Sequence, residues 1–350
     1  MRTSTPRRPA WALAGFLAMA AISFAAPAQP EGATPDLLPE LKACPHRIVC
    51  ESNRDGNWEL YVMNADGSDP VNLTKTPDAD ELYPKASPDG SRICFVCDEG
   101  KGKERTRNLY VMGLDGTGRA KIADNAREPC WSADGKSLAY LKGEFERYNL
   151  TDFVTKGIFI HDLKTGQTRE HPNSAKILHL YTLNWSPDGS WFVATVHGGM
   201  GFKHGILALE AAGDKVFNLG LEGCRPDLSP DGKRIAWGHG DFAVGVADLD
   251  FSGPAPRAVN VRNAVESKDP MEAYHADWSP DGRYIAYSYG PKIEGKSLKG
   301  LLPEFPGVPA PGWNLCVVDT ATKNRWVAIT RDGASCKEPD WLPAREGGAK

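Results

Sequence analysis

The residues of this sequence with the widest chemical range are its eight histidines and eight cysteines. Neutral imidazoles that converge on one point can bind a divalent metal ion. Four histidines stand at or near the ends of segments with strand-like alternation: His179, His197, His239 and His275. No two of these four lie at a close ligand spacing, so a metal site would require the fold to assemble them. Otherwise they are polar residues of the kind that holds ordered water.

The cysteines favour a structural role over a redox or zinc site. Cys94 and Cys97 form a CxxC pair, but they lie in the strand-like run SRICFVCDEG. An offset of three in a strand sends two side chains to opposite faces, whereas redox CxxC pairs begin helices. An even number of cysteines permits disulfides in an exported protein, and Cys50 with Cys336 is a candidate pair.

One short element recurs along the chain and indicates how these residues are positioned. Five segments repeat a Ser-Pro-Asp-Gly turn or a close variant, followed by an alternating strand: ASPDGSRICFV, WSADGKSLAYL, WSPDGSWFVAT, LSPDGKRIAWG and WSPDGRYIAYS. Their serines are 45, 54, 43 and 50 residues apart, which matches the period of a four-stranded propeller blade. In a tight turn proline fixes φ, aspartate bonds its own backbone and glycine accepts the left-handed conformation, so each copy predicts a hairpin.

The rest of each repeat supplies two more strands, and the two chain ends complement each other. Six strand-like segments such as WELYVMN and WNLCVVD follow the hairpins, and most lead through a small turn into a fourth strand. The amino end provides three strands without a first one, while 338–342 matches the context of a first strand, 128–132. We therefore expect an all-β, six-bladed β-propeller of four-stranded blades, with one blade shared between the termini.

One part of the chain resembles the WD-like propeller repeat of TolB-type proteins. It is the segment SNRDGNWELYVMNADGSDPVNLT, followed by YPKASPDGSRICF. Related repeats cover 47–343. The resemblance implies the propeller fold, and it implies little about ligand or reaction. TolB proteins also carry an amino-terminal α/β domain, for which the short segment 29–45 ahead of the first strand leaves no room, so we expect a TolB-like propeller without that domain.

Strand alternation places the connections on two faces. The Ser-Pro-Asp-Gly turns and the second small turns share one face, which we call the turn face. The longer connections share the other, the loop face, and they include 98–107, 142–156, 197–204 and 290–312. Variable loops on a rigid scaffold usually carry binding residues. The four histidines above also fall on this face, where they form a candidate ligand-binding set.

Two recurring residue types are explained by the repeat itself. One aspartate per turn and one tryptophan per first strand indicate turn chemistry and packing between blades rather than paired catalytic carboxylates or a sugar platform. No phosphate-binding glycine loop and no nucleophile, base and orienter set is visible in the sequence.

The first 28 residues have the features of a secretory signal peptide. Arg2, Arg7 and Arg8 precede an uncharged stretch that ends in Ala26-Pro27-Ala28. Cleavage would leave an extension, 29–45, a propeller, 46–343, and a flexible tail, 344–350. The mature chain would have 38 basic and 45 acidic residues, a net charge of −7, with no basic run. Nucleic acid and anionic membranes are therefore not expected partners.

Two classes of function remain for a periplasmic or secreted monomer. The absence of catalytic motifs favours a non-catalytic propeller that binds a protein or cell-envelope ligand through its loop face, with no cofactor. The alternative is a metal-assisted propeller lyase or hydrolase acting on a polymer or small metabolite, which rests on analogy with propeller-fold oligogalacturonate lyases.

Overall fold

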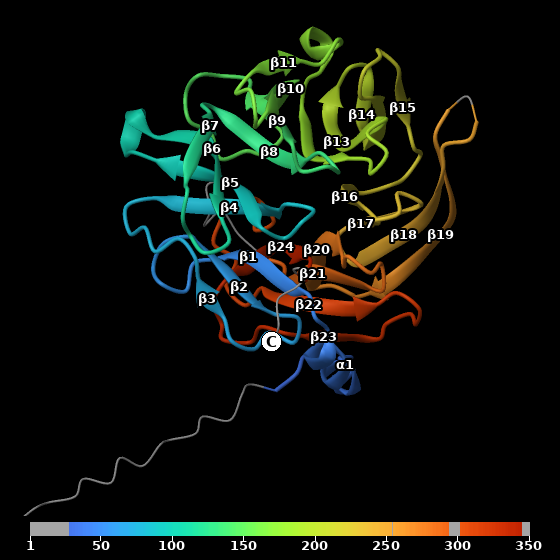
Figure 1. Ribbon diagram of the computed structural model, residues 1–350. Helices are drawn as coiled ribbons and strands as arrows, with labels where there is room; N and C mark the ends of the chain where they lie inside the picture. Colours follow the sequence, from blue (N-terminus) through green and yellow to red (C-terminus); the bar gives the residue numbers. More distant parts are fainter. Residues whose placement is uncertain (1–27, 254, 294–301, 345–350) are drawn as a thin grey trace, which may run out of the picture.

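The computed structural model describes residues 28–253, 255–293 and 302–344. The expected signal peptide lies outside this part except for Ala28, and so does the expected tail except for Ala344. Six four-stranded antiparallel sheets are arranged in a ring (Figure 1), which confirms the all-β, six-bladed propeller.

The six blades follow one another along the chain, and each is built from consecutive strands except the last. Blade 1 contains β4 (Asp80–Ala86), β5 (Arg92–Glu99), β6 (Thr106–Gly113) and β7 (Ala120–Ala123). Blade 2 contains β8 (Ala126–Trp131), β9 (Ser137–Gly143), β10 (Thr155–Asp162) and β11 (Thr168–Glu170). Blade 3 contains β12 (Leu180–Trp185), β13 (Trp191–Gly199), β14 (Phe202–Glu210) and β15 (Val216–Asn218). Blade 4 contains β16 (Cys224–Leu228), β17 (Arg234–Gly238), β18 (Ala243–Asp250) and β19 (Arg257–Glu266). Blade 5 contains β20 (Met271–Trp278), β21 (Tyr284–Pro291), β22 (Asn314–Asp319) and β23 (Trp326–Ala328).

Blade 6 joins the two ends of the chain, as the sequence predicts. Its strands are β24 (Cys336–Leu342), β1 (Arg47–Ser52), β2 (Glu59–Asn64) and β3 (Val71–Asn72), in that order. β24 pairs antiparallel with β1, and the two strands lie side by side in Figure 1. All seven residues of β24 are buried. The ring therefore closes through hydrogen bonds between the first and last strands of the propeller.

The predicted turns have the expected chemistry. In each of the five Ser-Pro-Asp-Gly-type turns the serine hydroxyl donates to the aspartate two residues later, at 2.5–2.7 Å. The glycine that follows takes a positive φ, 63° at Gly90 and 67° at Gly282. These aspartates are turn residues, in agreement with their recurrence once per blade.

The segment ahead of the propeller packs on blades 5 and 6. It contains a 3₁₀ turn, η1 (Pro35–Leu37), and the short helix α1 (Leu38–Ala43). Leu37 and Leu41 are fully buried in a core cluster with residues of β1, β21 and β22. Glu40 makes ion pairs with Arg283 and Arg325. Two further 3₁₀ turns, η2 (Gly102–Glu104) and η3 (Ser174–Lys176), lie in connections.

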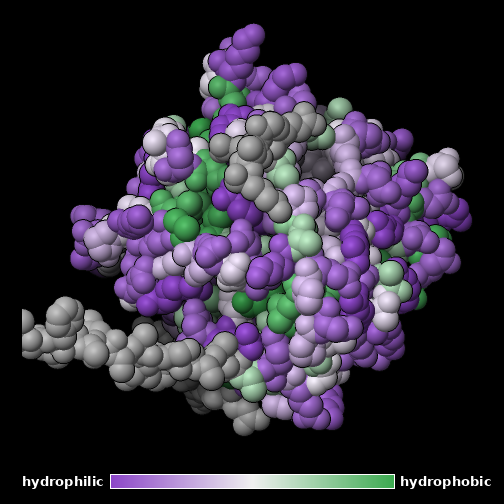
Figure 2. All heavy atoms as spheres, turned by 60° about the horizontal axis from the view of Figure 1, so that its bottom comes forward, coloured by the Kyte–Doolittle hydropathy of each residue, from purple (hydrophilic) through white to green (hydrophobic). Residues whose placement is uncertain are grey.

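The hydrophobic core is divided among the blade interfaces rather than gathered at one centre, as the separate core clusters show. On the face that Figure 2 presents, hydrophobic residues form small separate patches within a mainly hydrophilic surface. Among the described residues, the structure has no helix with the length and apolar character needed to cross a membrane.

All eight cysteines lie in the described part of the chain and all are free. The proposed disulfide between Cys50 and Cys336 is therefore wrong. In the register of blade 6, Cys336 lies opposite Ser52 and not Cys50. The Cys336 sulfur is 3.4 Å from the Ser52 hydroxyl and accepts a hydrogen bond from Arg54 at 3.3 Å.

Candidate functional site

The first strand of every blade carries the same irregularity, a β-bulge around one residue with a left-handed backbone. The register shifts at this place in all six first strands. The central residue has a φ of 50–57° and is not glycine in any blade. We call these residues the bulge ring: Tyr83, Glu128, Thr182, Arg225, His275 and Glu338. A bulge redirects a side chain, and here it does so once per blade.

The bulge ring surrounds the propeller axis and is buried. Contacts between blades that are not neighbours show this, since the Arg225 guanidinium of blade 4 lies 3.7 Å from the Glu338 carboxylate of blade 6. The His275 Nε2 atom lies 3.0 Å from the same carboxylate. Burial raises the pKa of Glu338 well above its usual value and lowers the pKa of His275 well below its own, with Arg225 lowering that of His275 further. Both groups therefore favour their neutral forms.

On the loop-face side of the bulge ring lies a cavity of about 320 Å³, which we call the loop-face cavity. Its base contains the ion pair of Arg225 and Asp152, with Nη2 and Oδ2 2.6 Å apart and both side chains at most 2% exposed. Other atoms of the same two groups, Nε and Nη1 of Arg225 and Oδ1 of Asp152, are buried without a hydrogen-bond partner. Buried polar atoms are normally satisfied, so unused donors and an acceptor on two residues that line a cavity favour a polar ligand or an ordered water beside them.

Aromatic rings form the walls of this cavity. Phe153 stacks on His197 with ring centroids 4.0 Å apart, and it also contacts Tyr181 and Phe305. The Tyr181 hydroxyl is 3.1 Å from His204 Nε2. Burial, together with the neighbouring His197, lowers the pKa of His204. The walls thus combine apolar ring faces with neutral hydrogen-bonding groups, a composition typical of ligand pockets.

The segment after the undescribed stretch 294–301 completes the cavity, with Leu302, Glu304 and Phe305 in its lining. A buried lysine of β24 fixes this segment. Lys337 Nζ donates to the carbonyl oxygens of Pro303, Phe305 and Val308 at 2.6–2.8 Å. It also lies 3.7 Å from the buried Glu51 carboxylate, which accepts the Gly307 amide at 3.0 Å. The first strand of blade 6 therefore positions one wall of the cavity.

The structure places the four histidines of the sequence analysis in four surroundings. His275 belongs to the bulge ring and bonds Ser288 and the Glu304 carbonyl. His197 lines the loop-face cavity. His179 lies between the Gly198 carbonyl and Glu144, at 2.7 and 3.3 Å. His239 lies in a separate groove and bonds Asn263 at 2.8 Å. Only His197 and His275 lie in or directly below the cavity.

No group of three or more histidine, cysteine or acidic side chains in the described residues is arranged to hold a metal ion. Sequence reasoning did not identify the residues that define the cavity: Asp152, Arg225 and His204. A signal existed for Arg225, because the repeat aligns it with Glu128 and Glu338, each immediately before a proline. Asp152 and His204 lie in connections that do not repeat, so no internal comparison could find them.

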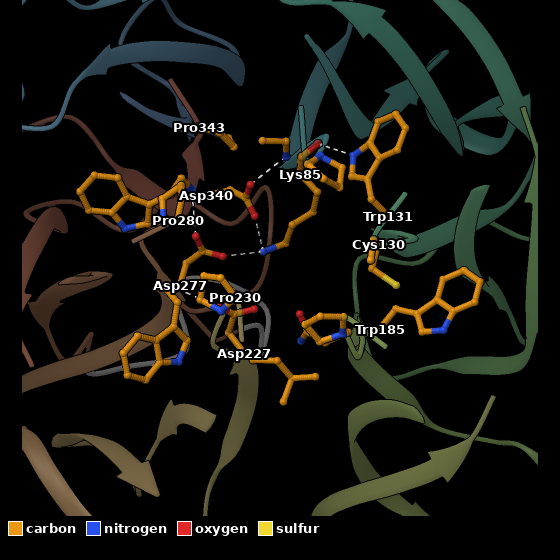
Figure 3. A pocket seen from close by; sticks show the side chains of 18 of the residues that line it. Lys85, Cys130, Trp131, Trp185, Asp227, Pro230, Asp277, Pro280, Asp340 and Pro343 are labelled. Atoms are coloured by element: carbon orange, nitrogen blue, oxygen red, sulfur yellow. Dashed lines mark hydrogen bonds and ion pairs between the residues drawn. The ribbon is translucent and has the colours of Figure 1, made fainter. Parts of the chain in front are cut away.

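At the opposite end of the channel, on the turn face, lies a second cavity of about 390 Å³ (Figure 3). We call it the turn-face cavity. Its lining includes the six residues that each follow a residue of the bulge ring by two positions in the sequence. One of them, Lys85, makes ion pairs with Asp340 at 2.9 Å and with Asp277 at 3.4 Å. The first-strand tryptophans also line it, which adds to the packing role expected from the sequence: Trp131, Trp185, Trp278 and Trp341.

Comparison with known proteins agrees with this fold. No protein-family model matches the chain. A segment of 86 residues is 40% identical to a TolB homologue from Chlorobaculum tepidum, covering 25% of this chain and 18% of that protein. A segment of 63 residues is 38% identical to dipeptidyl-peptidase 5 from Porphyromonas gingivalis, covering 17% of this chain and 9% of that protein. The chain thus matches much less than two thirds of either relative.

The crystal structure of TolB from Acinetobacter baumannii superimposes with a TM-score of 0.62 at 21% identity. The match covers 85% of this chain and 67% of that one. The chain therefore has the TolB-like six-bladed propeller fold.

Proposed function

We propose that this protein is an exported, non-catalytic propeller that binds a protein or cell-envelope ligand in the loop-face cavity. The observation that carries the proposal is the buried Arg225–Asp152 pair, which keeps unused hydrogen-bonding atoms at the base of an aromatic cavity. A ligand that offers an acceptor to Arg225 and a donor to Asp152 would satisfy these atoms, as an amide group does.

Two further ionisable groups of the cavity, Tyr274 and Glu304, add hydrogen-bonding capacity to the proposed site. The Tyr274 hydroxyl donates to Asp241, and burial followed by that bond raises the pKa of the phenol. Burial also raises the pKa of Glu304. Groups held neutral or paired in this way suit recognition of a polar ligand, and the aromatic walls add apolar contact area.

Capture of the partner by purified variants tests the proposal. Phe153 is partly exposed in the cavity, so Phe153→Ala removes a wall without touching the buried ion pair. We expect it to weaken capture of the partner from a cell-envelope extract by about tenfold, as loss of an aromatic anchor usually does. Lys136→Ala is the matched control, because Lys136 is 74% exposed and lies in a tight turn of the turn face.

If Lys136→Ala abolished capture and Phe153→Ala did not, the partner would bind the turn face, which would contradict the proposal of a loop-face site. Metal analysis of protein purified from its native compartment separates the alternative class, since a stoichiometric divalent metal together with turnover of a polymer would favour the metal-assisted enzyme. Fractionation of the producing cells tests export, and retention of an uncleaved amino terminus in the cytoplasm would contradict it.

A further inference from the structure

Between the loop-face cavity and the turn-face cavity lies a much smaller cavity of about 10 Å³, which we call the axial cavity. Arg225 lines both the axial cavity and the loop-face cavity, while Lys85 and Asp227 line both the axial cavity and the turn-face cavity. The axial cavity therefore lies in the middle of the channel. Five residues of the bulge ring, each from a different blade, line it: Tyr83, Thr182, Arg225, His275 and Glu338.

Four of these five residues carry a buried polar atom that has no hydrogen-bond partner among the described residues. Their side chains belong to residues that are at most 8% exposed, so bulk solvent does not satisfy them. Buried polar atoms are rarely left without a partner, and four such residues around one cavity indicate an occupant. The atoms are Nε and Nη1 of Arg225, Oε1 of Glu338, Oγ1 of Thr182 and the hydroxyl oxygen of Tyr83.

The printed distances indicate that the occupant bridges two blades. Arg225 Nη1 and Glu338 Oε1 lie 3.7 Å apart, which is too long for a direct hydrogen bond and suits a small molecule bonded to both. His275 Nε2 lies 3.0 Å from Glu338 Oε1, but its hydrogen bond goes to the Glu304 carbonyl oxygen at 2.8 Å. The Tyr83 hydroxyl also neighbours Glu128. Nη1, Oε1 and Oγ1 are therefore the three atoms that need a partner in the axial cavity.

The chemistry of these three atoms selects the occupant. A guanidinium group only donates hydrogen bonds, a carboxylate oxygen accepts them, and a hydroxyl group does either. A monatomic anion would accept from Arg225 but would leave Glu338 Oε1 without a donor, and the guanidinium would repel a metal cation. Water both accepts and donates. A cavity of about 10–15 Å³ is the smallest that holds a water molecule, which typically makes about three hydrogen bonds.

We propose that the axial cavity binds one water molecule, which accepts a hydrogen bond from Arg225, donates one to Glu338 and bonds the Thr182 hydroxyl. This water joins blades 3, 4 and 6 across the channel at their bulges. It fixes the Arg225 guanidinium at the base of the loop-face cavity and leaves Nε for a ligand there. Because the axial cavity has no room for a larger solute, the two larger cavities bind their ligands separately. The site does not depend on the proposed function.

A high-resolution crystal structure of the purified chain, together with a crystal soaked in sodium bromide, tests the proposal. We expect one density peak within about 2.6–3.2 Å of Arg225 Nη1, Glu338 Oε1 and Thr182 Oγ1, without an anomalous bromide signal. A bromide signal at this position would reveal an anion site and overturn the proposal. An axial cavity without density, or a direct hydrogen bond between Arg225 and Glu338 in its place, would overturn it as well.

Thr182→Val gives a second test, in which the sign of the effect decides. Valine keeps the shape of the side chain and its branched Cβ at the left-handed position, but it removes one bond to the water. We expect the melting temperature to fall by about 2 °C, the effect of one lost hydrogen bond. If the hydroxyl had no partner, its replacement by a methyl group would instead relieve a buried unsatisfied group. An unchanged or raised melting temperature would therefore contradict the proposed water.

Thr322→Val is the matched control, because it makes the same exchange at an exposed threonine outside the axial cavity. Its melting temperature should stay within about 1 °C of that of the wild type. A fall in Thr322→Val as large as that in Thr182→Val would show that the exchange itself, and not the loss of the water's partner, lowers stability.

Discussion

Replacement of Lys337 by methionine should destabilise the protein and release a wall of the loop-face cavity. The ammonium group is fully buried and bonds three carbonyl oxygens of the segment 303–308, and it lies beside the Glu51 carboxylate. Methionine has a similar length and keeps the apolar packing, but it offers no donor. The three carbonyls and Glu51 would then lose their common partner.

The expected loss of stability follows from two opposing contributions. Hydrogen bonds from a charged donor contribute about 1.5–3 kcal/mol each, so three give an upper range of about 4.5–9 kcal/mol. Burial of the ammonium costs free energy, as the lowered pKa of Lys337 shows, with burial the largest cause and Glu51 opposing it. Removal of one member of a buried ion pair typically costs about 3–5 kcal/mol, and we expect a loss in that range.

Urea unfolding measures the loss, and hydrogen exchange of the 302–313 amides measures release of the segment. Lys323→Met is the control, because Lys323 makes an exposed ion pair with Glu266, and it should change stability by less than about 0.5 kcal/mol. A loss below about 1 kcal/mol in Lys337→Met, with protection of the segment unchanged, would refute the role given to this lysine.

Four further outcomes are expected. Truncation before Cys336 removes β24 and exposes the edge of β1, so the protein should lose its cooperative melting transition and aggregate; a wild-type melt would contradict closure through blade 6. The contribution of Glu128 to stability should be lost as pH rises from about 4 to 8, because burial and the adjacent Asp152 raise its pKa to about 7 and the folded state binds a proton that the unfolded state has released. This contribution is about 3 kcal/mol, and the difference in urea midpoints between the wild type and Glu128→Gln across pH isolates it from His275, whose lowered pKa acts in the opposite direction. Below about pH 4 stability should fall, because turn aspartates such as Asp89 and Asp134 have pKa values of about 2 and lose their hydrogen bonds on protonation. Denatured protein should alkylate at eight thiols, and a count of six or fewer by mass spectrometry would show a disulfide that the structure lacks.

The fold was predictable from the sequence because its information is repeated. Each Ser-Pro-Asp-Gly-type turn specifies a hairpin by local chemistry, and five copies at a blade-sized spacing specify a ring. The matching contexts of 128–132 and 338–342 then predicted the shared blade, and the pairing of β24 with β1 confirms it. Local rules and repetition therefore sufficed for the architecture.

The candidate site was much less predictable, since it depends on contacts between distant residues that do not repeat. The loop-face cavity joins Asp152 and Arg225, 73 positions apart, with Glu304 of a third segment. The sequence predicts 290–312 only as a long connection of the loop face, and it gives no sign that the described part packs into the protein. Phe305 and Val308 are buried there, and Lys337 holds the backbone. A lysine that bonds carbonyl oxygens leaves no pattern in the sequence.

The bulge ring has a consequence for how this molecule can vary. Six strands use one strained backbone conformation, which costs about 1–2 kcal/mol per non-glycine residue, to present six side chains of five different chemistries to the axis. Since phenol, carboxylate, hydroxyl, guanidinium and imidazole groups all occupy this conformation, the backbone does not depend on which of them is present. Substitution at these positions can therefore diversify the interior of the channel while the architecture stays constant, so specificity and fold can evolve separately.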